Sequence, residues 1–540
     1  MDLDPRACYR ALCTRDPRFD GRLFVGVRTT GIYCRPVCPA RTPRREHVLF
    51  FPSAAAAQEA GFRPCLRCRP ETAPDLAAWR GTSNTVTRAL ALIELGGLDG
   101  SDVETLASRL GVGERQLRRL FRQHLGASPI AVAQTRRILL ARQLIDETTL
   151  SMTDVALAAG FGSIRRFNEM FQRLYRRPPT ALRRAGPTMS PPAGEVTVQL
   201  RYRPPYDWEA MLAFLAARAI PGVERVTSQT YARTIDLDGT QGVVVVRPGQ
   251  GHALEVTVRC SELARLPVII ARLRRVFDLA SEPEVIGAHL AEDPMLAPLV
   301  AARPGLRVPG AWDGFELAVR AILGQQITVR AAVQLAARVV AGYGEPLANT
   351  VGGADGLTHV FPSPARLAAL SPADLPMPDV RASALIALAS AAVDDPHLVR
   401  AGRAFEDVLA RLRRIKGIGP WTAQYIAMRE LREPDAFPHG DVALGRALMM
   451  LEGRPLAVAE RLARAERWRP WRAYAAQYLW MAALPASASH TQNARPTDRD
   501  YRPAAADGTA RTGRNVRRAM TRNDPPASRH SPPAIQKASR

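Results

Sequence analysis

Four cysteines near the amino end constrain the fold of this chain more than any other feature. Cys34 and Cys38 are separated by three residues, Cys65 and Cys68 by two, and 26 residues lie between the two pairs. Two close pairs on two turns are a common way to place four sulfurs around one tetrahedral zinc ion, and such sites are usually structural. The alternative is that the four thiols never meet. Four thiolates around a divalent ion leave a formal charge of −2, which repels DNA phosphate.

Length and charge indicate a protein of several domains that attracts polyanions. At about 150 residues per domain, the 540 residues predict roughly three to four domains. The net charge is +23, and nearly every cation is an arginine because Lys416 and Lys537 are the only lysines. Residues 1–80, 81–186 and 487–540 carry +6, +7 and +7, whereas 187–486 is nearly balanced at +3. The three basic segments are expected to attract polyanions.

The chain shows no pattern for a membrane or for export. No apolar run approaches the 18 residues of a membrane span, and the first twenty residues carry charges without an apolar stretch. Six of the seven cysteines lie in the first 68 residues, which in a reducing compartment favours metal binding over disulfides. We therefore expect a cytoplasmic protein. From Ser487 onward the chain lacks large apolar residues and predicts a disordered tail, which is either solvated filler or a non-specific attraction for DNA.

Two segments around the cysteines carry a family resemblance. The sequences RTTGIYCRP at 28–36 and AGFRPCLRC at 60–68 resemble the N-terminal zinc domain of the Ada family, which serves the adaptive response to alkylation. The resemblance implies one zinc ion held by all four cysteines, and a nucleophilic Cys34 that irreversibly accepts a methyl group from a DNA methylphosphotriester. A metal-bound thiolate stays deprotonated near neutral pH. Methylation would change the charge of the site from −2 to −1 and thereby strengthen DNA binding.

Residues 82–185 show the pattern of two helix-turn-helix units. An apolar stripe at helical spacing, interrupted by a glycine turn, runs through 103–121 and again through 155–171. A helix over 130–145 is predicted to join the two units, which would allow recognition helices to enter successive turns of the major groove.

The pair of units, over about 82–185, resembles the AraC-type DNA-binding domain, with AAGFGS at 158–163 and RPP at 177–179 as matching landmarks. The polar faces of the two second helices are either ordinary solvated faces or surfaces that read base edges. Six side chains are candidates for base contacts: Arg115, Gln116, Arg119, Arg165, Arg166 and Asn168.

The carboxyl-terminal half changes from strands to helices. Residues 196–260 alternate polar and apolar side chains and predict strands with one helix near 208–218, whereas 261–484 predicts helices. Within the helical part, IKGIGPWTA at 415–423 predicts a glycine turn followed by a helix start. Backbone N–H groups at such a turn can hold a phosphate. A plain turn between two helices is the alternative.

One acid, Asp441, lies ahead of a new predicted helix twenty residues beyond Trp421. Its simplest role is that of a helix N-cap, which is compatible with catalysis. Trp421 and Tyr425 are spaced i, i+4 and therefore share a helix face. Three further tryptophans follow: Trp468, Trp471 and Trp480. Aromatic residues at helical spacing usually belong to a core, so these residues alone do not distinguish a core from a base pocket.

Five features together resemble the AlkA-type 3-methyladenine-DNA glycosylases of the helix-hairpin-helix superfamily. They are GIGPWTAQY at 417–425, Asp441, AILGQ at 321–325, AARPGLR at 301–307 and RWRPWR at 467–472. The resemblance implies that Asp441 is the catalytic carboxylate, that Gly417 and Gly419 contact DNA, and that four aromatic residues line the pocket for a flipped base: Phe214, Trp421, Tyr425 and Trp480. Aromatic faces favour cationic alkylated purines. A carboxylate near the sugar can stabilise oxocarbenium character.

The chain departs from its relatives at several positions. The residue after Gln325 is Gln326, so the wedge that fills the gap left by the flipped base is either polar or is borne by Ile327. Lyase-type relatives carry a lysine where Trp421 stands, so a monofunctional glycosylase is expected. The cysteine set of iron–sulfur relatives is missing, so no iron–sulfur cluster is expected. The second methyltransferase half of the Ada family, with its PCHR signature, is also missing, so repair of O6-methylguanine is not predicted.

The sequence therefore predicts a mostly α multidomain protein. Its expected parts are an α+β four-cysteine zinc domain (1–80), an all-α tandem helix-turn-helix domain (82–185), a linker (186–195), an α+β glycosylase whose β-rich subdomain precedes helix-hairpin-helix subdomains (196–486), and a disordered basic tail (487–540). It is expected to act as a monomer on promoters and alkylated sites of double-stranded DNA, with RNA polymerase as a partner.

Two other functions are compatible with the same motifs. The chain is either a transcription regulator whose glycosylase-like half only binds DNA, or a repair enzyme whose first two domains only raise the local concentration of DNA. Asp441→Asn distinguishes the first of these from an enzyme, and Cys34→Ala in a promoter reporter distinguishes the second from a sensor.

Overall fold

A computed structural model describes residues 4–74, 84–183, 194–348, 356–399 and 405–483. Every helix within these ranges is too short or too polar to cross a lipid bilayer. Most of the predicted linker (186–195) and all of the predicted tail from Ser487 onward lie outside the described residues.

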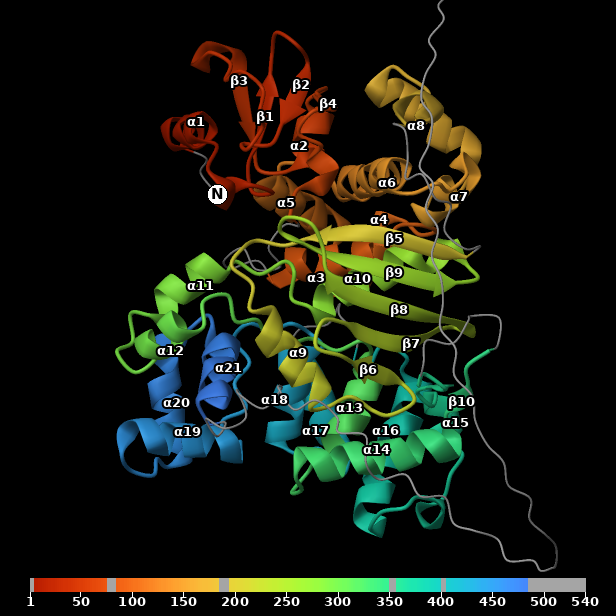
Figure 1. Cartoon of the computed structure of the whole chain (residues 1–540), viewed down its shortest axis with the longest axis vertical. Helices are drawn as coiled ribbons and strands as arrows, with labels where there is room; N and C mark the ends of the chain where they lie inside the picture. The colour runs from red at the N-terminus through yellow and green to blue at the C-terminus, as the bar shows by residue number, and fades with distance from the viewer. Residues whose placement is uncertain (1–3, 75–83, 184–193, 349–355, 400–404, 484–540) are drawn as a thin grey trace, which may run out of the picture. The chain divides into compact units, whose positions relative to one another are not determined.

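Residues 4–74 form a small sheet with short helices around it (Figure 1). The elements are α1 (Pro5–Thr14), β1 (Phe24–Val27), β2 (Ile32–Cys34), β3 (Val48–Phe51), α2 (Ala54–Glu59) and β4 (Arg63–Pro64). The strand order is β3-β1-β2-β4, in which β4 runs parallel to β2 and the other pairs are antiparallel. Val25 on β1 and Tyr33 on β2 are completely buried. The expected α+β architecture of this part is confirmed.

Residues 84–183 are helical, as predicted. The helices are α3 (Asn84–Glu94), α4 (Val103–Leu110), α5 (Glu114–Leu125), α6 (Pro129–Glu147), α7 (Met152–Ala158) and α8 (Ile164–Tyr175). Asp102 caps α4 by accepting a hydrogen bond from the backbone N–H of Thr105, and Gly111 ends α4 in the left-handed region with φ of 71°. Ser163 caps α8 in the same way. These caps fix where the helices of the two helix-turn-helix units begin or end.

Strands come first in the carboxyl-terminal half. They are β5 (Glu195–Arg201), β6 (Glu224–Val226), β7 (Tyr231–Leu237), β8 (Thr240–Pro248) and β9 (Ala253–Cys260), and α9 (Trp208–Ala216) lies between β5 and β6 in the chain. The five strands form one antiparallel sheet in the order β5-β9-β8-β7-β6. Val196, Val198 and Leu200 are buried at alternate positions of β5, which explains the period of two in the sequence.

Helices follow the sheet (Figure 1). They are α10 (Leu266–Val276), α11 (Pro283–Leu290), α12 (Ala297–Ala302), α13 (Gly314–Leu323), α14 (Val329–Tyr343), α15 (Pro364–Ala368), α16 (Asp379–Asp394), α17 (Phe405–Arg414), α18 (Pro420–Arg429), α19 (Val442–Glu452), α20 (Val458–Ala465) and α21 (Arg472–Ala482). One departure from the predicted all-helical pattern is a pair of two-residue strands, β10 (Glu345–Pro346) and β11 (His359–Val360). Two residues are too few to show an alternation in the sequence.

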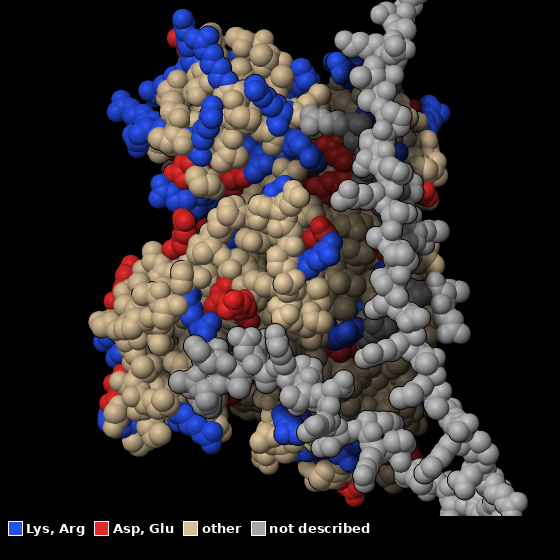
Figure 2. All heavy atoms as spheres, in the orientation of Figure 1, with Lys and Arg blue, Asp and Glu red and all other residues tan. Residues whose placement is uncertain are grey.

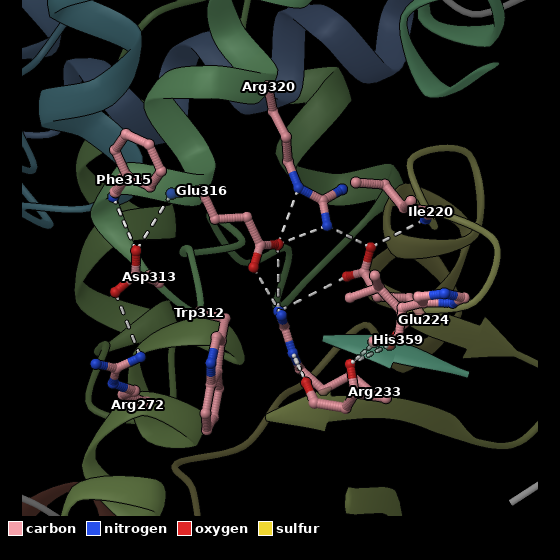
Figure 3. A network of polar contacts seen from close by, with 12 residues as sticks. Ile220, Glu224, Arg233, Arg272, Trp312, Asp313, Phe315, Glu316, Arg320 and His359 are labelled. Carbon is pink, nitrogen blue, oxygen red and sulfur yellow. Dashed lines mark hydrogen bonds and ion pairs between the residues drawn. The ribbon is translucent and has the colours of Figure 1, made fainter. Parts of the chain in front are cut away.

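A buried network of charges ties the sheet to α13 (Figure 3). Arg233 on β7 donates to Glu316 at 2.7 Å, and Arg320, one helical turn further along α13, donates both to Glu316 and to Glu224 at 2.6 Å. Two arginines face two glutamates, so the network is balanced in charge. Burial alone would raise the pKa of Glu316, but Arg233 and Arg320 outweigh it and lower this pKa to about 2. Arg320 also donates to the backbone carbonyl of Arg218 at 2.9 Å.

Candidate functional sites

The four predicted cysteines converge on one point. Cys34 ends β2 and Cys65 follows β4, and because these strands are parallel neighbours the two residues lie side by side. Cys38 and Cys68 come from the turns that follow. All four Sγ atoms lie within 4.8 Å of one another, so the alternative in which the thiols never meet is wrong. Sulfurs that ligate one zinc ion at about 2.3 Å lie about 3.8 Å apart in a tetrahedron, so the donor set fits zinc.

The chemistry of the donors supports the same conclusion. The close contacts with the sulfurs of Cys38, Cys65 and Cys68, together with burial, raise the pKa of Cys34, because thiols this close cannot all ionise without a cation. Backbone N–H groups of Arg67 and Arg35 donate to the sulfurs of Cys65 and Cys68, both at 3.4 Å. Such donors stabilise thiolates.

Cys34 differs from the other three cysteines. It is partly exposed, whereas Cys38, Cys65 and Cys68 are buried. Among the described residues, no backbone N–H group donates to the Cys34 sulfur, unlike those of Cys65 and Cys68. Cys34 is therefore the least buried residue of the four.

Arg35, the residue after Cys34, fastens the cluster to the rest of this part. Its guanidinium donates to Asp20 at 2.8 Å, to the hydroxyl of Thr72 at 2.6 Å and to the carbonyl of Cys68 at 3.2 Å. The surface around the cluster is basic: Figure 2 shows arginine side chains gathered over the part built from α1 and β1–β4. Its exposed arginines include Arg28, Arg41, Arg44, Arg45 and Arg67. A basic surface of this kind suits the DNA backbone.

The six candidates for base contacts all lie exposed on the second helix of a helix-turn-helix unit. Arg115, Gln116 and Arg119 are on α5, and Arg165, Arg166 and Asn168 are on α8. The apolar faces of the same helices are buried, with Phe121 on α5 and Phe167 on α8 both at 0% exposed. Arg165 is engaged by Glu169 one turn along the helix at 2.8 Å, so it is less available to DNA than its neighbours.

The predicted glycine turn joins α17 to α18. Gly417 has φ of 95°, and a Cβ atom there would lie 2.4 Å from the Cβ of Ala384 on α16, so only glycine fits. Gly417 and Gly419 are exposed, whereas Ile418 between them is buried. The backbone of the turn is therefore exposed to solvent, while the buried side chain of Ile418 fixes the turn to the core.

The loop between α13 and α14 is fastened to this turn. Gln325 donates to the carbonyl of Gly417 at 2.8 Å and to the hydroxyl of Thr422 at 3.0 Å. The next residue, Gln326, is exposed and adopts the left-handed region with φ of 58°, which is unusual for a residue with a side chain. Ile327 is 37% exposed. The loop thus projects Gln326 and Ile327 from a rigid support.

Two indole nitrogens hold the carboxylate of Asp441. Asp441 caps α19, as expected, by accepting a hydrogen bond from the backbone N–H of Leu444 at 2.9 Å. Trp421 donates to Oδ2 at 2.8 Å and Trp480 donates to Oδ1 at 2.9 Å. Three N–H donors from three helices therefore fix the orientation of one partly exposed carboxylate.

Aromatic rings surround this carboxylate. The rings of Trp421 and Tyr425 are stacked with centroids 5.4 Å apart and an interplanar angle of 15°, which confirms that they share a face of α18. Trp480 meets Tyr425 edge-on at 6.3 Å. In contrast, Trp468 and Trp471 are buried at 1% and 7% exposed, and the Trp468 indole donates to Asp293. These two tryptophans are core residues.

Sequence reasoning missed two arginines beside these rings. The guanidinium carbon of Arg429 lies 4.3 Å from the ring centroid of Phe214, and that of Arg218 lies 3.9 Å from it. Both Phe214 and Arg218 belong to the segment of α9 and its carboxyl end. Arg429 follows Tyr425 at i+4 on α18, so helical spacing was a signal that could have located it.

Comparison with known proteins places each part in a family. The models for the metal binding domain of Ada, a helix-turn-helix domain and the AlkA N-terminal domain match residues 7–71, 106–185 and 197–313. The probable bifunctional transcriptional activator/DNA repair enzyme AlkA of Mycobacterium tuberculosis is 42% identical over 488 residues, which cover 89% of this chain and 97% of that protein.

Two Escherichia coli proteins match separate parts of the chain. DNA-3-methyladenine glycosylase 2 is 39% identical over 286 residues, covering 52% of this chain and 95% of its own length. The bifunctional transcriptional activator/DNA repair enzyme Ada is 38% identical over 153 residues, covering 28% of this chain and 42% of its own length.

The four-cysteine site, the paired helix-turn-helix units and the aromatic site beside the glycine turn define a class of protein that joins a metal-binding DNA regulator to a DNA glycosylase. Because the match covers 89% of this chain, the chain belongs to the family of bifunctional transcriptional activator/DNA repair enzymes of the AlkA type.

Proposed function

We propose that this protein couples the detection of DNA alkylation to transcription and to excision of the damaged base. In this proposal Cys34 irreversibly accepts a methyl group from a DNA methylphosphotriester, which switches on promoter binding. Asp441 serves the hydrolysis of the N-glycosidic bond of alkylated bases such as 3-methyladenine. The match to the Ada metal-binding domain and to the AlkA domain in one chain supports joining the two activities.

The exposure of Cys34 supports its role as methyl acceptor. Cys34 is the only partly exposed residue of the four, and Cys65 and Cys68 accept backbone hydrogen bonds that reduce the nucleophilicity of their sulfurs. A zinc ion held by the four cysteines would keep Cys34 deprotonated near neutral pH. Methylation then removes one negative charge from Cys34, which weakens the repulsion between this basic surface and DNA phosphate.

The hydrogen bonds from Trp421 and Trp480 to Asp441 carry the proposal of a glycosylase. A carboxylate that serves only as an N-cap needs no further donors, yet both oxygens of Asp441 are held by indole nitrogens. An oriented carboxylate beside stacked aromatic rings can stabilise positive charge on the sugar while the base leaves. Phe214, Trp421, Tyr425 and Trp480 would line the pocket of the flipped base.

The reaction is proposed to end with base release. Trp421 stands where lyase-type relatives carry a lysine, so no Schiff base would form with the sugar. The backbone of Gly417 and Gly419 would hold a DNA phosphate. Gln326, projected by the loop after α13, would fill the space left by the flipped base, with Ile327 beside it.

The regulatory half would read promoter DNA as a monomer and recruit RNA polymerase. The exposed side chains of α5 and α8 belong to two helix-turn-helix units that α6 joins, an arrangement that suits two turns of the major groove. The proposed base-reading residues are Arg115, Gln116, Arg119, Arg165, Arg166 and Asn168.

Two variants of the full chain test the proposal. Asp441→Asn should lose excision of 3-methyladenine from duplex DNA while still binding that DNA. Absence of excision by the parent protein would instead support a regulator whose second half only binds DNA. Cys34→Ala should abolish the response of a promoter reporter to methylating agents. An undiminished response would reject the sensor.

A further inference from the structure

The two residues proposed to enter the duplex lie between two anchored residues. Gln325 is fixed to the glycine turn by two hydrogen bonds of its side chain. Thr328 begins α14 by accepting a hydrogen bond from the backbone N–H of Ala331 at 3.2 Å. Gln326 and Ile327 stand between these anchors and are exposed. The Gln326 side chain forms no hydrogen bond with a described residue, so its direction follows from its backbone conformation.

The backbone of Gln326 is strained. Its φ of 58° lies in the left-handed region, where the Cβ atom of an L-residue crowds the following carbonyl oxygen. Such a conformation persists only where surrounding groups hold it in place. The φ angle describes rotation about the N–Cα bond of Gln326, so it depends on the orientation of the peptide group that joins Gln325 to Gln326. A contact that fixes this peptide group therefore also fixes where the Gln326 side chain points.

Arg381 on α16 makes this contact. Its guanidinium donates to the carbonyl oxygen of Gln325, which belongs to this peptide group, at 2.8 Å. Arg381 is the third residue of α16, a position where the helix dipole disfavours a cation. It forms no ion pair with a residue of the described ranges. Neither helix stability nor charge pairing therefore accounts for an arginine here, whereas the contact with the loop does.

The same helix also supports the glycine turn. Ala384, three residues after Arg381 on α16, lies so close to Gly417 that a Cβ atom on this glycine would be 2.4 Å from the Cβ of Ala384. The first turns of α16 thus contact both the loop that carries Gln326 and the turn proposed to hold a DNA phosphate. Arg381 is placed to keep Gln326 in register with that phosphate site.

We infer that Arg381 is a positioning residue that holds Gln326 in the conformation in which its side chain enters the duplex. This inference rests on the proposed glycosylase function and on the proposed role of Gln326. Extrusion of a paired base costs unpairing and unstacking energy, and this cost is smaller for a base that is already unpaired. Loss of Arg381 should therefore slow the excision of a paired base more than that of an unpaired one.

The test compares two duplexes within each variant of the full chain. Single-turnover excision is measured on 7-methylguanine, an alkylated base, placed opposite either cytosine or an abasic-site analogue, which leaves the base unpaired. Arg381→Met should slow excision from the paired duplex about tenfold, as expected for the loss of a hydrogen bond from a charged group, and should change the rate on the unpaired duplex little. Arg381→Lys keeps a charged donor and should recover most of the rate. Arg338→Met removes one charge from an exposed position of α14 and should keep both parental rates.

A double-mutant cycle tests whether Arg381 acts through Gln326. Gln326→Ala should also slow excision of the paired base, and Arg381→Met should slow it little further in that background. Full additivity, a parental rate for Gln326→Ala, or an equal fall on both duplexes in Arg381→Met would overturn the inference. Arg381→Gln, which is shorter and neutral, replaces Arg381→Met if that variant does not fold. If the parent protein excises the base from neither duplex, the proposed glycosylase function fails instead, so the two failures are distinguishable.

Discussion

The indole nitrogen of Trp421 lies 2.8 Å from Oδ2 of Asp441 and donates a hydrogen bond to it. Trp421→Phe keeps an aromatic ring against Tyr425 but removes this donor. Because hydrogen bonds to charged groups contribute about 1.5–3 kcal/mol, single-turnover excision should slow by about tenfold or more. The affinity for DNA should be unchanged, because the ring face remains.

Trp468→Phe is the matched control for this prediction. It also removes an indole donor to a carboxylate, that of Asp293 at 2.9 Å, but in the core. It should lower the midpoint of thermal unfolding without changing the rate of excision. Equal rates for Trp421→Phe and the parent would reject a positioning role for the indole nitrogen.

The exposure of Cys34 predicts where methylation occurs. After incubation with DNA that carries methylphosphotriesters, mass spectrometry of peptides should find one added methyl group on the peptide that contains Cys34. Cys13 is also exposed but lies outside the cluster, so Cys13→Ala should be methylated to the same extent as the parent. Methyl mass on the Cys13 peptide, or none on the Cys34 peptide, would contradict the proposed acceptor.

The two arginines at the start of α8 should differ in their contribution to promoter recognition. Arg165 is held by Glu169 at 2.8 Å, whereas Arg166 forms no ion pair with a residue of the described ranges. A good base contact contributes about 1–3 kcal/mol, so Arg166→Ala should weaken binding to a promoter at least several-fold more than Arg165→Ala. Gel-shift titrations against promoter and random DNA at fixed salt measure the difference.

Arg177→Ala is the matched control for Arg166→Ala, because it also removes one positive charge from an exposed position, here beyond α8. Arg177→Ala should weaken binding to promoter and random DNA equally, because a phosphate contact carries no sequence information. If Arg166→Ala also acts equally on both DNAs, it contacts the backbone and does not read bases.

The Glu316 network should make the glycosylase part sensitive to acid. The pKa of Glu316 is lowered to about 2 from an ordinary value of 4.5, so its ionised form stabilises the fold above the ordinary value. This stabilisation, on the order of 3 kcal/mol, is lost as the pH falls from about 5 towards 2. Urea unfolding followed by tryptophan fluorescence reports mainly this part, since six of the seven tryptophans lie beyond residue 196.

Glu316→Gln should be less stable at neutral pH, because Arg233 loses its partner in the interior, and its stability should fall less between pH 5 and pH 3. Glu195→Gln removes a more exposed ion pair with Arg259 and should keep the parental pH dependence. If the stability of Glu316→Gln falls between pH 5 and pH 3 as much as that of the parent, other groups cause the acid sensitivity.

Several features follow from patterns that are local in the sequence. The periods of two and of 3.6 residues predicted β5, β9 and the helices α4 to α8, because each period reflects which neighbouring side chains face the core. The cysteine spacing predicted a metal site, because two short turns place four sulfurs close together once their strands pair. The two-residue strands β10 and β11 were missed, since they are too short for any period.

What the sequence determined by itself is the kind of each part: a four-cysteine cluster, paired helix-turn-helix units, a sheet followed by helices, and an acid that caps α19. Only the tertiary structure decided that Asp441 meets Trp421 and Trp480, and that Arg429 lies against Phe214. The physical reason is that caps and periods depend on residues a few positions apart, whereas these contacts join residues 20 to about 200 positions apart through the packing of separate helices.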